Sequence, residues 1–63
     1  MKLTYNEEND RYNDFHCGHC FKIKVNDKWK GVRIEYSTHW YLIDEDGFTS
    51  SCKRLEGADI QEY

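Results

Sequence analysis

A chain of 63 residues with a formal net charge of −3 has room for one domain at most. A core of this size gives only marginal stability, so we expect a metal, a disulfide or oligomerisation to support the fold. The negative charge disfavours binding to the nucleic-acid backbone, which requires lysine and arginine to displace counterions.

The three cysteines are an odd number, which does not suit the disulfide framework of a small secreted protein. The chain starts without a basic segment followed by an apolar run, and no segment approaches the ~20 apolar residues that cross a bilayer. We therefore expect a cytoplasmic protein. In that compartment clustered cysteine and histidine are typical of metal or redox sites.

The residues are expected to form one domain over 1–63, with a polar N-terminal segment at 1–14 and an acidic tail at 53–63. Residues 4–14 are rich in Asn and Asp, which favour turns. This segment therefore predicts a loop, with room for a short strand at residues 2–5.

Two strands are predicted next from alternation of apolar and charged residues. Residues 21–25 form the first, and residues 32–36 form the second after a turn at Asn26 and Asp27. Trp29 is out of phase with the second strand, and Gly31 lies between, which indicates a β-bulge.

The second half of the chain predicts a central strand at 39–43, which is apolar on both faces, and a shorter strand at 48–52. The acidic sequence 44–47 joins them as a turn. The tail after residue 52 has alternatives, because Leu55 and Ile60 fit either a helical turn or an extended segment. The expected fold class is small β or α+β, a four-stranded antiparallel meander with a Cys/His zinc site at one end.

The densest chemical signal is the C-x₂-C unit of Cys17 and Cys20, whose spacing suits two ligands of one tetrahedral zinc ion. Gly18 allows the tight turn between them. In the meander, Cys52 and His39 fall at the same end of the sheet. We therefore predict one structural zinc held by these four residues, with His16 as the alternative fourth ligand.

Other interpretations of the thiols remain open. A reactive Cys17–Cys20 pair would suit redox chemistry, although a strand pattern follows it at once, where a redox motif opens a helix. A metal-free thiol cluster is a further alternative. Hydrolytic zinc catalysis is disfavoured because three thiolates and an imidazole leave no open coordination position. His19 lies inside the C-x₂-C unit and is expected at the surface.

Several blocks in order resemble a family of short uncharacterised proteins from Firmicutes and their prophages. The blocks are residues 16–21, Trp29, residues 33–36, residues 40–42 and residues 55–57. That family carries no established activity, and a third cysteine is not general in it, so Cys52 as a ligand rests on the strand order. By class, a small acidic zinc-bearing prophage-type protein also looks like the anti-CRISPR proteins, which inhibit type II CRISPR effector nucleases.

This class resemblance implies a non-enzymatic inhibitor in a bacterial host cell that binds a type II Cas nuclease protein, without direct nucleic-acid or membrane contact. The nuclease has basic surfaces for guide RNA and target DNA. The expected partner-binding residues are acidic: Asp44, Glu45, Asp46, Glu56, Asp59 and Glu62. An ordinary solvated surface would have the same composition.

The alternative function is a zinc-ribbon-like nucleic-acid-binding module. Its basic residues would lie beside Trp29 on two adjacent strands: Lys22, Lys24, Lys28, Lys30 and Arg33.

Overall fold

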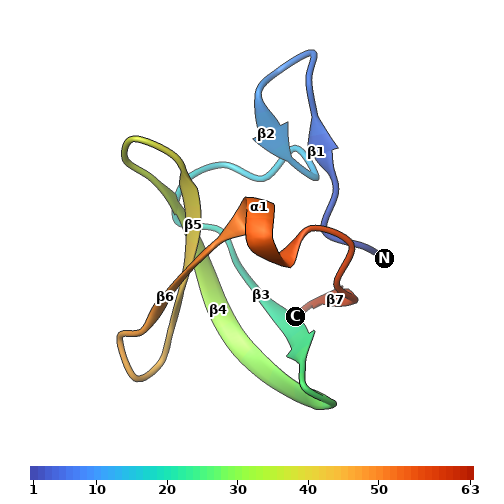
Figure 1. Ribbon diagram of the computed structural model, residues 1–63, viewed down its shortest axis with the longest axis vertical. Coiled ribbons are helices and arrows are strands. Elements are labelled where there is room, and N and C mark those ends of the chain that lie inside the picture. Colours follow the sequence, from blue (N-terminus) through green and yellow to red (C-terminus); the bar gives the residue numbers. More distant parts are fainter.

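The computed structural model describes residues 1–63 as two antiparallel sheets and one helical turn (Figure 1). A two-stranded hairpin precedes a five-stranded sheet with the strand order β6-β5-β4-β3-β7. The expectation of a small antiparallel β fold is confirmed. The elements are β1 Tyr5–Asn6, β2 Arg11–Tyr12, β3 Cys20–Val25, β4 Lys28–Tyr36, β5 Trp40–Asp44, β6 Thr49–Ser51, α1 Cys52–Leu55 and β7 Ile60–Glu62.

The four strands expected from the sequence all form, as the meander β3 to β6. The β-bulge predicted near Gly31 is wrong, because β3 and β4 pair without interruption from Cys20 opposite Arg33 to Val25 opposite Lys28. Trp29 lies out of phase with Val32 because its side chain belongs to the opposite face of a continuous strand.

The fifth strand of the sheet comes from the tail. Ile60 pairs with Ile23 and Glu62 with Phe21, so β7 lies at the edge of the sheet beside β3. The helical turn α1 precedes it, so the tail contains both of the conformations that its sequence left open. The expected fourth strand ends at Ser51, one residue early, and Cys52 begins α1.

Residues 4–14 form a hairpin where the sequence predicted a loop. Its turns depend on Asp10, Asn13 and Asp14, which have φ angles of 54°, 52° and 60°. Asn and Asp tolerate this left-handed region better than other non-glycine residues. The residue types that predicted a loop therefore also permit a tight hairpin.

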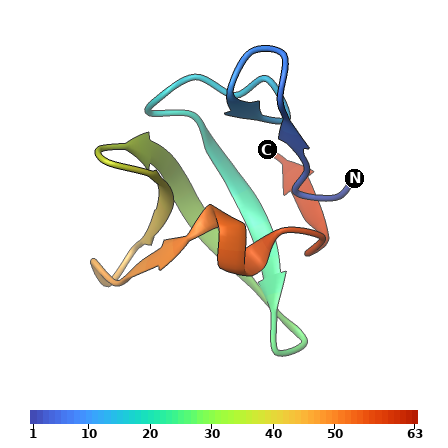
Figure 2. The same cartoon turned by 45° about the horizontal axis from the view of Figure 1, so that its top comes forward.

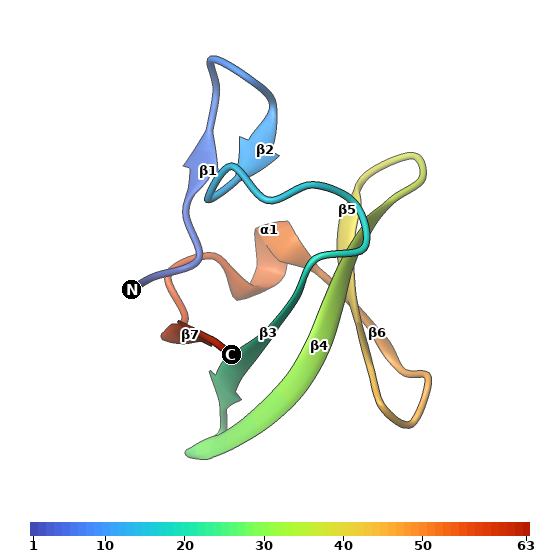
Figure 3. The same ribbon diagram turned by 180° about the vertical axis from the view of Figure 1, so that it is seen from behind.

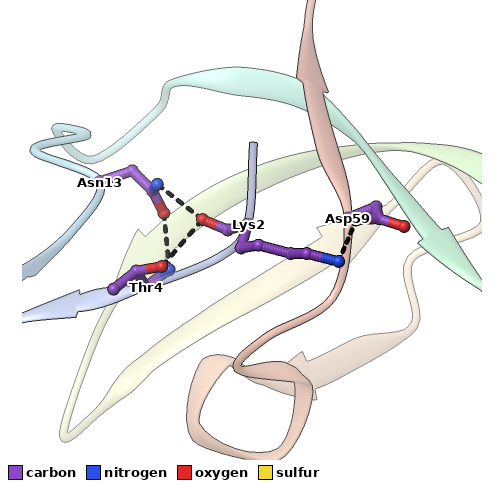
Figure 4. Close-up of polar contacts among 4 residues, drawn as sticks. All are labelled: Lys2, Thr4, Asn13 and Asp59. Carbon is purple, nitrogen blue, oxygen red and sulfur yellow. Dashed lines mark hydrogen bonds and ion pairs between the residues drawn. The ribbon is translucent and has the colours of Figure 1, made fainter.

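The N-terminal segment is held to the hairpin and to the tail by polar contacts (Figure 4). The Asn13 side chain donates to the Lys2 carbonyl at 2.8 Å and accepts from the Thr4 amide at 2.9 Å. The Lys2 ammonium lies 2.5 Å from Asp59. The Leu3 amide donates to the Ala58 carbonyl. These contacts place Leu3, which is fully buried, over the core.

The core lies on the concave side of the bent sheet, where α1 packs against β5 and β6 (Figure 2). Alternate residues of the strands point inward, and the hairpin and its following loop add Tyr12 and Phe15. The buried residues are Leu3, Tyr12, Phe15, Phe21, Ile23, Val32, Ile34, Leu42, Cys52 and Ile60. Side chains of intervening residues define the opposite side of the sheet, which we call the outer face.

The structure has one helix, α1, which is a single turn long and too short to cross a membrane.

Candidate functional site

Cys17 and Cys20 lie in the connection from β2 to β3, and both are exposed. Gly18 has a φ of +90°, a conformation that a side chain disfavours. The loop is fixed to β4, since the Gly18 amide donates to the Ile34 carbonyl at 2.8 Å and the Ile34 amide donates to the His19 carbonyl at 3.0 Å. The two thiols therefore lie at the surface, on a loop that backbone hydrogen bonds hold to β4.

Cys52 lies in a different environment, in the core and with no exposed surface. Burial raises the pKa of its thiol from 9.0 to about 12, so the thiolate that binds zinc is disfavoured there. Cys20 is exposed, whereas its neighbour Phe21 is buried in the same core as Cys52, so Cys20 and Cys52 lie on opposite sides of the sheet.

The strand order separates the predicted ligands further. Cys20 belongs to β3 and Cys52 follows β6, with β4 and β5 between them. Three strand spacings correspond to roughly 14 Å. The sheet is bent (Figures 1 and 3), and the buried core that includes Cys52 lies on its concave side, whereas Cys20 is exposed.

The histidines are also dispersed. His39 precedes β5 and lies 3.2 Å from the Thr38 hydroxyl. His19 stacks on Phe15 with ring centroids 4.3 Å apart, and its Nε2 lies 3.0 Å from Glu62. His16 is exposed beside Cys17.

As arranged in the structure, no group of three or more His, Cys, Asp or Glu residues could hold a metal ion. The four residues predicted as zinc ligands are therefore not brought together. A single-chain site of Cys17, Cys20, Cys52 and His39, or His16, stays a prediction for metal analysis to test.

The acidic turn between β5 and β6 is well defined. One Asp44 carboxylate oxygen accepts from the amides of Asp46 and Phe48, both at 3.0 Å. Gly47 has a φ of +87° and donates its amide to the Asp44 carbonyl. Asp44 thus organises the turn, while Glu45 and Asp46 take part in none of the ion pairs of the structure.

The other acidic residues predicted for partner binding lie elsewhere. Asp59 is paired with Lys2, whose hydrogen bond and positive charge lower the pKa of Asp59. Glu62 contacts His19, and Glu56 follows α1. Because β6 and β7 are opposite edges of the sheet, the tail residues Asp59 and Glu62 do not extend the acidic turn.

A groove on the outer face was not predicted from the sequence. It has a volume of about 410 Å³, and Cys20, Arg33, Glu45 and Tyr63 are among its lining residues. Gly31 forms part of its floor, and a Cβ there would lie 2.5 Å from the Tyr63 hydroxyl. A lone glycine inside a strand pattern was the available signal, because such glycines often mark close approach of another group.

The predicted basic face is divided by the strand register. Lys22 and Lys24 pair with Gly31 and Trp29 and share the outer face with them. Lys28 and Lys30 pair with Val25 and Ile23 and belong to the other side.

On the outer face, the Lys22 ammonium lies 5.5 Å from the centre of the Tyr63 ring. The Arg33 Nε lies 2.7 Å from a Glu35 carboxylate oxygen. The positive charge of this face is therefore smaller than the composition of the two strands suggested.

A family model described as a domain of unknown function (DUF5348) matches residues 1–60. No curated protein and no solved structure matches the chain.

Proposed function

The chain belongs to the family described as domain of unknown function DUF5348, and we propose that it acts as a non-catalytic binding protein that docks on a basic protein surface. The observation that carries the proposal is the acidic turn between β5 and β6. Its Glu45 and Asp46 carboxylates have no cationic partner within the chain. Two large exposed aromatic residues, Trp29 and Phe48, accompany it.

The turn and Trp29 form one surface. A shallow hollow of about 210 Å³ lies between them, lined by Trp29, Lys30, Gly31 and the acidic residues 44–46. Trp29 is 47% exposed and Phe48 is 73% exposed. Exposed aromatic side chains are typical anchors of protein interfaces, and unpaired charges beside them favour a partner of opposite charge.

The backbone of this surface is already ordered. Asp44 holds the turn through two amide hydrogen bonds, and β5 pairs with both β4 and β6. A surface that needs little ordering on binding loses less conformational entropy in the complex. This favours a role in stable association.

As the partner we propose a type II Cas effector nuclease, so that the chain would act as an anti-CRISPR inhibitor. Such nucleases hold guide RNA and target DNA in positively charged channels, which complement an acidic ligand. The support for this partner is charge complementarity and the class resemblance of the sequence.

The test is a DNA-cleavage assay with a panel of type II Cas nucleases, combined with a pull-down of each nuclease by the tagged chain. We expect inhibition of at least one nuclease at about one inhibitor per nuclease, together with a stable complex. Inhibition at far lower ratios, without association, would show a catalytic inhibitor. Absence of both inhibition and binding across the panel would refute a Cas partner.

A charge-neutral variant tests the surface itself. In E45Q/D46N both unpaired carboxylates are removed while Asp44 continues to hold the turn. We expect association with the captured nuclease to slow by about 10-fold at low salt, with a weaker salt dependence. The matched control is E7Q/E8Q, which makes the same charge change in the exposed β1–β2 turn. Equal effects of the two variants would exclude the acidic turn as the contact surface.

A second candidate function is nucleic-acid binding through the outer face. The observation that favours it is the placement of Lys24 directly opposite Trp29 on the outer face, with Lys22 two residues away on the same strand, because cations beside an exposed aromatic ring suit single-stranded nucleic acid. Fluorescence anisotropy with single-stranded RNA and DNA at increasing salt tests it. Binding that disappears in K22A/K24A and persists in E45Q/D46N would favour this function over protein docking.

A further inference from the structure

We propose that the Cys17–Cys20 loop is half of a zinc site, which the same loop of a second copy of this chain completes. One zinc ion bound by four thiolates would then join two copies. The proposal is independent of the function proposed above.

The loop has the features of a metal-binding half-site. Both thiols are exposed, and they are separated by a glycine in a conformation that allows a tight turn. The only polar contact of the Cys20 thiol is a weak one to the Gly18 carbonyl at 3.7 Å. Three backbone hydrogen bonds hold the loop, two to Ile34 and one from the His19 amide to the His16 carbonyl. The thiols are therefore held in place and remain available to a ligand.

The rest of the chain supplies no partner for this half-site. Cys52 is buried on the other side of the sheet, and the imidazoles of His19 and His39 have contacts with Glu62 and Thr38. His16, which is exposed beside Cys17, forms no metal-binding group with the two thiols. No third ligand-type residue completes a group around the loop. Structural zinc sites are four-coordinate and tetrahedral, so the two vacant ligand positions must be filled from another molecule.

A second copy of the chain fills them with the correct chemistry. A two-fold axis through the metal would bring two identical loops together, and such isologous contacts are the commonest in homo-oligomers. The loop lies at the periphery of the molecule, away from α1, so a second loop can approach it (Figure 2). Zinc-bridged pairing would also supply the cross-link that the size of the domain leads us to expect.

The charge near the loop suits this arrangement. Four thiolates on one zinc ion leave a net negative charge. Arg33 lies directly across from Cys20 on β4, and both side chains belong to the outer face. Directly opposed residues in an antiparallel pair are close enough for opposite charges to interact favourably. One Arg33 from each copy would therefore add positive charge beside the thiolates, partly offset by Glu35, with which its Nε is paired.

The experiment uses the full chain, purified under reducing conditions and titrated with zinc chloride. Native mass spectrometry and analytical ultracentrifugation follow mass and metal content. We expect a dimer with about one zinc per two chains, which the chelator EDTA converts to monomer. Cobalt substitution should give the visible absorption of a four-thiolate tetrahedral site.

Three variants distinguish the cysteines that bind zinc from the cysteine that packs in the core. C17S and C20S should lose zinc and dimerisation while keeping the far-ultraviolet circular dichroism of the native fold. C52V should keep both zinc and dimer, since Cys52 takes no part.

Three results would overturn the proposal. The first is a monomer with one zinc per chain, which would identify a single-chain site. The second is a Cys17–Cys20 disulfide under mild oxidation with no zinc uptake after reduction, which would identify a redox pair. The third is a dimer that survives EDTA and the C17S substitution.

Discussion

The role of Cys52 separates the two ways in which the third cysteine could stabilise this protein. In the structure its side chain is completely buried among apolar residues, and no metal-binding group includes it. If Cys52 stabilises the fold by packing, the loss of stability on replacement should depend on the polarity and volume of the new side chain. If it binds zinc, every replacement removes a ligand and should be equally damaging.

The magnitudes follow from burial. Cys52→Ser places a hydroxyl in an apolar environment, which costs about 1–3 kcal/mol when the group has no hydrogen-bond partner. Cys52→Val keeps an apolar side chain of similar size and should cost less than about 1.5 kcal/mol. The domain itself is expected to have an unfolding free energy of roughly 3–9 kcal/mol, from its length and the usual stability per residue. The serine variant should therefore lose a large fraction of the stability and melt roughly 5–20 °C lower.

The assay is urea and thermal unfolding followed by circular dichroism, with and without EDTA. We expect Cys52→Val to remain close to the native protein, Cys52→Ser to be clearly less stable, and EDTA to leave the difference between them unchanged. The reasoning would be refuted if the two variants were equally destabilised and if EDTA reduced the native protein to the same level. That result would identify Cys52 as a metal ligand.

Two further predictions concern pH and the N-terminal hairpin. The pKa of Cys52 is raised to about 12 by burial, that of Tyr5 is raised to about 12 because its hydroxyl donates to Asp10, and that of Tyr12 is raised by burial. Above pH ~9 the folded state therefore binds more protons than the unfolded state, so the unfolding free energy should fall between about pH 9 and 12. Urea unfolding at a series of pH values measures this, and an unfolding free energy that stays constant across the range would contradict the prediction. Asn13→Ala should cost about 1–3 kcal/mol, because it removes two hydrogen bonds to the backbone and places alanine at a φ of 52°. Asn13→Gly relieves only the backbone strain, so it should be less damaging in thermal unfolding, and equal melting temperatures would exclude the strain contribution.

The meander was predictable because its signals are local. Alternation in β3 and in the second half of β4 reports which residues face the core, and the turn at Asn26 and Asp27 has positive φ angles at both positions, as a two-residue hairpin requires. The acidic turn was equally visible, since Gly47 supplies the positive φ that closes it.

The candidate sites were less predictable, because they depend on which face and which edge of the sheet each residue occupies. The sequence correctly indicates that Cys20 and Cys52 fall toward the same end of the sheet, yet side chains at one end can point to opposite sides of it. The outer-face groove depends on Tyr63 and Glu45, which approach Gly31 from opposite sides: Glu45 follows β5, the neighbour of β4, and Tyr63 follows β7, which lies beyond β3. No local pattern contains that information.

The sequence by itself determined the small antiparallel β fold, the four meander strands and the acidic turn, because each depends on residues within a few positions of one another. Only the tertiary structure decided that the tail returns as β7 beside β3, that residues 4–14 pair as a hairpin, and that Cys52 is part of the core. Those outcomes depend on contacts between segments up to the full length of the chain apart, as between Lys2 and Asp59. Their free energy comes from burying apolar surface shared by several segments, which no single stretch of sequence encodes.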